Sequence, residues 1–314
     1  MLGSMKRGFF VGLSTTWTLG KVIFPITIIV AILQYTPILQ WVIKGIEPFM
    51  GWLGLSGDAA IPLVLGNFLN LYAAIGAILT LDLTVKEVFI LAVMLSFSHN
   101  MFIESTVAKR VGVSITLTVA VRVGLALLSG FFINLVWKGG SELAKYGFIS
   151  KQEEVITGWL PILMDAVSKA LLGILQLALI VIPLMVVIQI LKDLKWLDTF
   201  SRWMSPFTRA LGMKENTSTT LAAGLLFGLA YGAGVMIQAA KEDGVSKKDL
   251  TLAFIFLVSC HAVVEDTLIF IPLGIPVLPL LLIRLVVAIL LTVVVAVVWN
   301  RVQPVDRKEA TYEG

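Results

Sequence analysis

Apolar stretches of about 20 residues recur along this chain, and each is long enough to cross the hydrocarbon core of a bilayer. Examples are residues 22–43, 113–137 and 275–299. Hydrophobic residues make up 58% of the sequence and charged residues 14%. Soluble domains run at about 45–50% and about 25%, and their cores could not absorb this much apolar surface. The sequence therefore predicts an all-α integral membrane protein in the inner or plasma membrane.

The remaining composition limits the classes of function. The net charge is +4, and no basic face interleaved with aromatic residues indicates a nucleic-acid partner. Cys260 is the single cysteine, and no GxSxG elbow, P-loop or HExxH motif occurs. We therefore expect a protein that is not an enzyme and carries no cofactor. The expected partners are membrane lipid and a small solute or ion, with a homo-oligomer as an open alternative.

The two halves of the chain resemble each other. The offset between matched residues is 158 at first and becomes 162 after an insertion near residues 241–244. Chance similarity of two apolar strings explains matched Leu and Val, but it explains matched Pro, Trp, Arg and His poorly. Both histidines of the chain fall at equivalent positions. The matched pairs include Pro25 and Pro183, Gly66 and Gly224, His99 and His261, Glu104 and Asp266, Arg122 and Arg284, and Trp137 and Trp299.

We therefore interpret the chain as two copies of one unit. Residues 1–137 form the first repeat, 138–169 a linker with a surface helix, 170–300 the second repeat and 301–314 a polar tail. Each unit has a long apolar helix, an amphipathic segment, a short apolar stretch interrupted by glycine, a capped helix and a second long helix. In order, these are residues 22–43, 44–55, 59–81, 84 onward and 113–137 in the first unit, and residues 170–191, 192–213, 221–240, 246 onward and 275–299 in the second.

Helix starts and charge distribution add detail to this unit. Thr84-x-x-Glu87 and Ser246-x-x-Asp249 are hydroxyl-then-acid patterns that cap helix N-termini.

If the interrupted stretch of each unit is a re-entrant hairpin, each unit crosses the membrane three times and the repeats are inverted. That topology places 16 basic residues inside and 6 outside, against 14 and 8 when every stretch spans. The sequence thus favours six spans, two hairpins and cytoplasmic termini; a glycine-rich packing face remains the alternative.

Ionisable side chains within the apolar segments are candidates for function, because charges in a bilayer are costly. Three interpretations stay open. The acids neutralise the arginines in buried structural pairs, or the group forms a proton relay or ion site, or histidine, sulfur and carboxylate ligands bind a metal. Cys260 and His261 are the candidate metal ligands, and the candidates for ion or proton coupling are His99, His261, Glu104, Glu265, Asp266, Arg122 and Arg284.

The two interrupted stretches supply a second set of candidates. Non-helical backbone at membrane depth survives only against protein or a wet cavity, so its amides and carbonyls are available to a solute. Tight packing is the simpler role for these positions. The candidate solute-binding residues are Gly66, Asn67 and Asn70 in the first unit and Gly228, Tyr231 and Gly232 in the second.

The order of these elements resembles the nucleoside-recognition, or Gate, family, and the resemblance covers nearly the whole chain. The segments that carry it are the Pro48 turn, the Gly66-Asn67 tip, the Thr84-x-x-Glu87 cap and the break at Ser98-His99-Asn100. Relatives include concentrative nucleoside transporters, the membrane part of ferrous iron transporter B and spore maturation proteins A and B. The resemblance implies inverted repeats with hairpins and a secondary transporter or gated permease. The alternatives are a non-transporting membrane scaffold and a divalent metal transporter.

Overall fold

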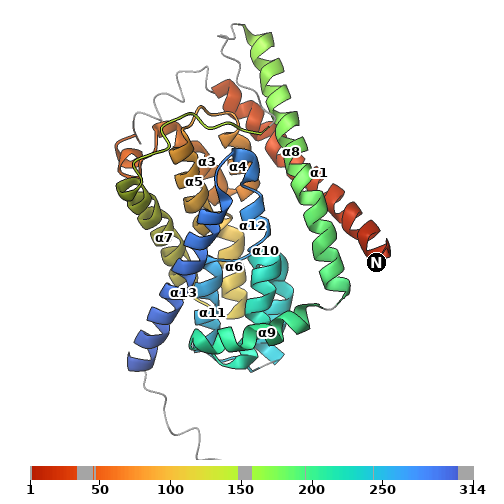
Figure 1. Cartoon of the computed structure of the whole chain (residues 1–314), viewed down its shortest axis with the longest axis vertical. Coiled ribbons are helices and arrows are strands. Elements are labelled where there is room, and N and C mark those ends of the chain that lie inside the picture. The colour runs from red at the N-terminus through yellow and green to blue at the C-terminus, as the bar shows by residue number, and fades with distance from the viewer. Residues whose placement is uncertain are drawn as a thin grey trace, which may run out of the picture.

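The computed structural model describes residues 2–33, 45, 47–147, 158–194, 196–242 and 244–302. These residues are almost entirely helical, and the β-structure among them is one isolated bridge between Thr84 and Leu143 (Figure 1). Four segments among them are long and apolar enough to cross a membrane: 85–111, 115–136, 159–191 and 277–302. The prediction of an all-helical chain with several apolar spans is confirmed at this level.

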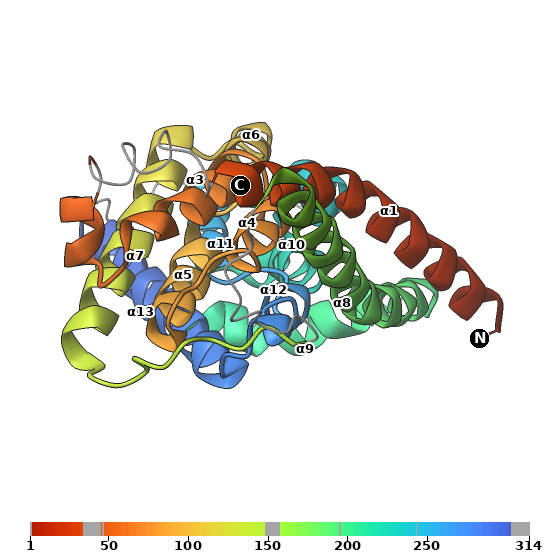
Figure 2. The same ribbon diagram turned by 90° about the horizontal axis from the view of Figure 1, so that it is seen from above.

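Two long helices, α1 (Leu2–Leu33) and α8 (Trp159–Asp193), lie side by side along one flank of the molecule (Figures 1 and 2). Their contact depends on small residues: a Cβ added at Gly8 would come within 2.5 Å of the Cα of Val186. Such small-residue contacts let helix backbones approach closely in membranes.

The bounds of these two helices differ from those predicted. Helix α1 begins at Leu2 rather than at Val22, and residues 34–44 of the predicted helix lie outside the described residues. Helix α8 begins at Trp159, so residues 159–169, which the sequence assigns to the linker, continue directly into it.

The first interrupted stretch forms two short helices. A 3₁₀ turn, η1 (Gly57–Ala59), leads into α3 (Ala60–Phe68), and α4 (Leu71–Ile78) follows after a break. Asn70 is extended at this break, and its side chain accepts a hydrogen bond from the N–H of Ala73. An Asn at such a position caps the orphan N–H groups of the next helix, so the break has a local cause.

Three helices complete the first half. Helix α5 (Val85–Ser98) begins with the predicted capping box, in which Thr84 and Glu87 exchange side-chain and backbone hydrogen bonds. Helix α6 (Met101–Val111) follows, and α7 (Ile115–Val136) ends one residue before Trp137. In the most apolar 18-residue stretch of residues 85–111, which covers α5 and α6, 78% of the residues are buried. In the corresponding stretch of α7 the share is 22%. Helix α5 is therefore central, and α7 presents its apolar side chains outward.

The second half repeats this order. Its elements are α9 (Trp196–Ala210), η2 (Glu215–Thr217), α10 (Ser218–Glu242), α11 (Lys247–Ser259), α12 (Glu265–Leu268), η3 (Ile271–Leu273) and α13 (Val277–Val302). Ser246 caps α11 as predicted, by accepting a hydrogen bond from the N–H of Asp249. Residues 249–259 of α11 are all buried, whereas only 22% of the residues in the most apolar part of α13 are. Helices α11 and α13 thus correspond to α5 and α7.

Helix α10 is interrupted at Gly228, whose φ of 73° and ψ of 176° are not helical. A Cβ at Gly232 would lie 3.0 Å from the carbonyl oxygen of Ala223, nine residues earlier. Residues nine apart in a straight helix are separated by about 13 Å. The two halves of α10 therefore fold back against each other, and only glycine adopts the Gly228 conformation without strain.

Candidate functional site

The site is built where α5 and α11 end. Helix α5 ends at Ser98 with His99 as its C-cap, and the next residue, Asn100, adopts a φ of 53°. At the equivalent point after α11, Ala262 adopts a φ of 40°. The interrupted stretches bond the freed backbone. Asn100 donates its N–H to the carbonyl of Gly66 at 2.8 Å, and Ala262 donates to that of Gly224 at 3.1 Å. Equivalent residues of the two halves thus make equivalent contacts.

A buried arginine closes each of these helix ends. Arg122 on α7 donates to the carbonyls of Phe97 and His99, and Arg284 on α13 donates to the carbonyl of His261 at 2.7 Å. Both arginine side chains are fully buried. Terminal carbonyls of a helix have no partner within the helix, so the guanidinium groups satisfy polar atoms that would otherwise be orphaned.

Each arginine also pairs with an acid of its own half. The Nη1 of Arg122 lies 2.7 Å from Oε2 of Glu104 on α6, and the Nη2 of Arg284 lies 3.2 Å from Oδ2 of Asp266 on α12. Buried charges are normally paired in this way, because an unpaired one carries a large desolvation cost. The interpretation in which the acids neutralise the arginines as buried structural pairs therefore describes part of the role of these four residues.

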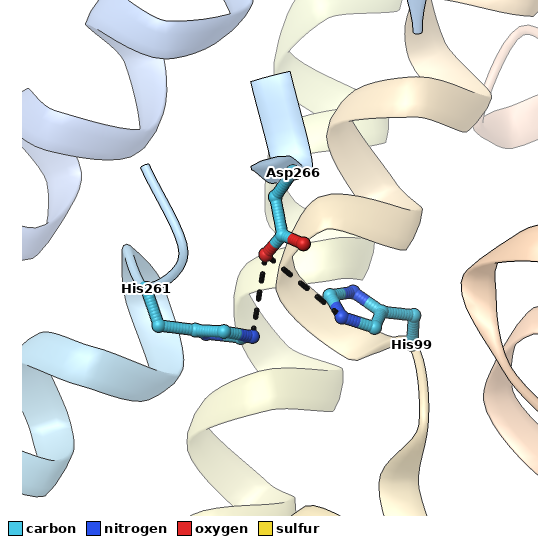
Figure 3. A group of neighbouring side chains, drawn as sticks. All are labelled: His99, His261 and Asp266. Carbon is cyan, nitrogen blue, oxygen red and sulfur yellow. Dashed lines mark ion pairs between the residues drawn. The ribbon is translucent and has the colours of Figure 1, made fainter. Parts of the chain in front are cut away.

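The two histidines meet between these pairs, with ring centroids 5.3 Å apart. The Nε2 atom of His99 lies 3.5 Å from Oε1 of Glu104 and 3.9 Å from Oδ2 of Asp266. The Nε2 atom of His261 lies 3.4 Å and 3.3 Å from the same two oxygens. Figure 3 shows Asp266 between the two imidazoles. Both carboxylates therefore face both rings, and acid, histidine and arginine from the two halves form one cluster.

The orientation of each ring is fixed by a backbone contact. Nδ1 of His99 lies 2.7 Å from the carbonyl of Leu95, and Nδ1 of His261 lies 2.7 Å from that of Leu257. Because a carbonyl only accepts, Nδ1 carries hydrogen and donates in both residues. The Nε2 atoms consequently point at the carboxylates.

Tyr72 on α4 belongs to the site, although the sequence analysis missed it. Its hydroxyl donates to Oε1 of Glu265 at 2.7 Å, which links the first interrupted stretch to the second half. Glu265 and its neighbour Asp266 are both buried. The available signal was a phenol within an otherwise apolar segment, where a buried hydroxyl requires a partner.

The side-chain amides of the first interrupted stretch, those of Asn67 and Asn70, form hydrogen bonds within that stretch. Asn67 donates to the carbonyl of Leu63 at 2.7 Å, and Asn70 caps α4. A Cβ at Gly66 would lie 2.3 Å from a methyl carbon of Leu95, so this glycine allows α3 to pack on α5. Asn67 also lines an apolar cavity of about 330 Å³ that reaches Ser98 at the end of α5.

The second interrupted stretch, around Gly228, packs closely beside His261. A Cβ at Gly228 would lie 3.1 Å from that of Ala262 and 3.7 Å from the ring of His261. Gly232 packs on Ala223 as described above, and the side chain of Tyr231 lies outside the described part of the chain.

The structure thus gathers six of the predicted coupling residues into one cluster and places Glu265 beside it. Cys260 is buried, but it is not part of the close group formed by His99, His261 and Asp266. Imidazole nitrogens and carboxylate oxygens converging in a dry interior can hold a cation or exchange a proton.

Comparison with known proteins gives the family. The sequence model of the Gate family, described as nucleoside recognition, matches residues 16–121 and again residues 174–281. The chain is 63% identical over 304 residues to the uncharacterized membrane protein YvoD of Bacillus subtilis (strain 168), covering 96% of this chain and 97% of the relative. No solved structure matches the chain. On these matches and on the paired architecture, the chain belongs to the Gate, or nucleoside-recognition, family of membrane proteins.

Proposed function

We propose that this protein is a secondary transporter or gated permease whose solute or ion passes through the cluster of His99, His261, Glu104 and Asp266. The observation that carries the proposal is the convergence of these buried groups from equivalent positions of the two halves, at the ends of α5 and α11. A fold needs no such cluster for stability, since apolar side chains would fill the same space at lower desolvation cost.

The architecture supports this proposal. Transporters of several folds consist of inverted repeats with discontinuous helices that meet near the bilayer midplane. Here the family model matches twice, and each half has an interrupted stretch that bonds the end of a broken helix. We propose that the halves are inverted repeats and that α3–α4 and α10 are re-entrant hairpins. The non-helical backbone at Gly228 is buried against protein, as membranes require, whereas Leu69 at the first break is exposed.

Cysteine labelling tests the topology that this proposal includes. Cys260 is first replaced by serine, and Lys214→Cys and Lys138→Cys are then made separately, since both lysines are exposed. A membrane-impermeant maleimide applied to whole cells should label the variant at 138 and spare the variant at 214. Labelling of both positions, or of 214 alone, would refute the inverted arrangement with cytoplasmic termini.

Uptake into proteoliposomes tests transport itself. The purified chain is first screened for thermal stabilisation by uridine, adenosine, Zn²⁺, Co²⁺ and small dicarboxylates, because a ligand that binds the folded state stabilises it. The stabilising compound is then offered to proteoliposomes that contain wild-type protein or His261→Ala. Uptake by wild-type protein and its loss in a folded His261→Ala variant are expected.

The same experiment distinguishes a non-transporting membrane scaffold. If His99→Ala and His261→Ala proteins fail to fold, and wild-type liposomes take up none of the stabilising compounds, the cluster is structural. The transport proposal then fails.

A further inference from the structure

The geometry points to a binding site for a divalent transition-metal ion, formed by His99, His261, Asp266 and Glu104. This inference names the cargo or coupling ion of the site and in that respect rests on the proposed function, while binding itself can be measured separately. Three ligand atoms, Nε2 of each histidine and a carboxylate oxygen of Asp266, lie within 4.8 Å of one another (Figure 3). Oε1 of Glu104 faces both Nε2 atoms, from 3.5 Å and 3.4 Å.

Three of the four nitrogen–oxygen separations match what a bound ion requires, and the fourth, between His99 and Asp266, is a few tenths of an ångström longer. They run from 3.3 to 3.9 Å. A tetrahedral ion with bonds of about 2.0–2.2 Å separates its ligands by about 3.3–3.6 Å. Small inward movements of the side chains would thus bring all four atoms to bonding distance of one ion.

One of these atoms lies within ion-pair distance of both acids but is not hydrogen-bonded in the part of the chain that the structure describes. Nε2 of His261 is buried and makes no hydrogen bond among the described residues, although both carboxylates face it. An unbonded polar atom in a dry interior calls for a ligand. A cation bound by this lone pair would satisfy the nitrogen and the carboxylates together.

The surroundings of the ligands are those of metal sites. A metal-ligating histidine usually donates its other N–H to a carbonyl or carboxylate, which fixes the ring and its tautomer. Both histidines do so, through the carbonyls of Leu95 and Leu257. Arg122 pairs with Oε2 of Glu104 and leaves Oε1 directed at the rings, so the acid remains an oriented anion.

The balance of charges in the cluster indicates that a bound metal ion would exchange with the ions in solution. Arg122 and Arg284 already balance Glu104 and Asp266, so a divalent ion brings uncompensated positive charge into the cluster. Among the described residues, the buried Glu265 is the neighbouring acid that can offset it. Such a site should bind more weakly than a structural zinc site and release its ion to a chelator. Two nitrogens and two oxygens suit Zn²⁺, Co²⁺ or Fe²⁺, whereas Mg²⁺ and Ca²⁺ prefer all-oxygen sites.

Cobalt absorption tests the site directly in the full chain. Purified protein in detergent is treated with EDTA, exchanged into buffer and titrated with CoCl₂. We expect one Co²⁺ per chain, the visible bands of tetrahedral cobalt, and displacement by Zn²⁺ but not by Mg²⁺ or Ca²⁺. Absence of bound Co²⁺ in the folded wild-type protein, or equal displacement by Ca²⁺, overturns the inference without reference to any variant.

Variants assign the ligands. His99→Ala, His261→Ala, Asp266→Asn and Glu104→Gln should each lower the Co²⁺ affinity at least about tenfold. The matched control Glu215→Gln changes an exposed acid of η2 that is not one of the cluster residues, and it should leave affinity unchanged. Cys260→Ser should also leave the bands unchanged, and a thiolate charge-transfer band in wild-type protein would overturn this ligand set. Should a histidine variant fail to fold, Glu104→Gln and the wild-type bands still decide.

Uptake separates this inference from the proposed function. The fluorescence of a metal-sensitive dye enclosed in proteoliposomes should change on addition of external Co²⁺ or Zn²⁺ only when the proteoliposomes hold wild-type protein or Glu215→Gln. Binding without uptake would keep the metal site and reject its transport. Uptake of another solute by a chain that binds no Co²⁺ would keep the transporter and reject the metal.

Discussion

Tyr72 of the first half and Glu265 of the second are joined by a hydrogen bond of 2.7 Å, across 193 positions of sequence. We expect Tyr72→Phe to lower the free energy of unfolding by about 1–3 kcal/mol, because it leaves a buried carboxyl group without this donor. The same change should weaken Co²⁺ binding by loosening the short helix that carries both Glu265 and Asp266. Thermal unfolding in detergent and cobalt titration measure the two effects.

Tyr146→Phe is the matched control for this change. The hydroxyl of Tyr146 donates to the carbonyl of Leu81 at 3.0 Å, away from the histidine cluster. It should cost a similar stability and leave cobalt affinity unchanged. Equal loss of cobalt affinity in both variants would mean that Tyr72 acts only through general stability.

Removing one member of the Arg122–Glu104 pair should be more harmful than removing both. Arg122→Met leaves a buried carboxylate and the carbonyls of Phe97 and His99 without their donor, at a cost of about 3–5 kcal/mol. Adding Glu104→Gln removes the unpaired charge and should restore part of that loss. Melting temperatures of the wild type, the two single variants and the double variant form the required cycle. If the double variant is the least stable, the lost carbonyl contacts outweigh the unpaired charge.

An ion pair at the end of α8 predicts a response to acid. Asp193 lies beyond the apolar span, and its pKa is held below the usual value by a hydrogen bond with Ser4 and by the guanidinium of Arg7 at 2.7 Å. A lowered folded-state pKa gives stability that is present above about pH 4 and lost as pH falls through the folded-state value. Melting temperature should therefore drop less between about pH 6 and about pH 3 in Asp193→Asn than in wild type. Arg7→Gln should reduce the drop in the same direction, and an unchanged drop in both variants would count against the pair.

Much of the site could be predicted because its signals are local and rare. Two histidines at equivalent positions of a repeated unit predicted one shared site, and the rings are indeed 5.3 Å apart. The hydroxyl-then-acid caps at Thr84 and Ser246 were confirmed, since capping depends on residues three apart. The contact of Glu104 with both histidines could not be derived, because it depends on how the two halves dock.

Other features depend on contacts that no period in the sequence encodes. Asn70 was predicted as a candidate for solute binding, and the capping of the following helix by its side chain was not foreseen. The N-terminal extension of α1 to Leu2 was missed because the polar residues between Ser14 and Lys21, together with Lys6 and Arg7, interrupt its hydropathy. Because α1 packs along α8, this N-terminal extension is part of the folded structure.

The contact of α1 with α8 predicts opposite effects of one substitution at two glycines of the same helix. A Cβ at Gly8 would meet the backbone of Val186 at 2.5 Å, so Gly8→Ala should force the helices apart and cost about 1–3 kcal/mol. A Cβ at Gly3 meets only the tip of the Arg7 side chain at 3.7 Å, so Gly3→Ala should stabilise α1 by about 0.5–1 kcal/mol, as alanine does in a helix. Thermal unfolding of both variants in detergent, and then in liposomes, measures the difference. A gain in stability from Gly8→Ala would show that α1 does not pack on α8 in this register, because a backbone atom at that distance cannot yield as a flexible side chain does.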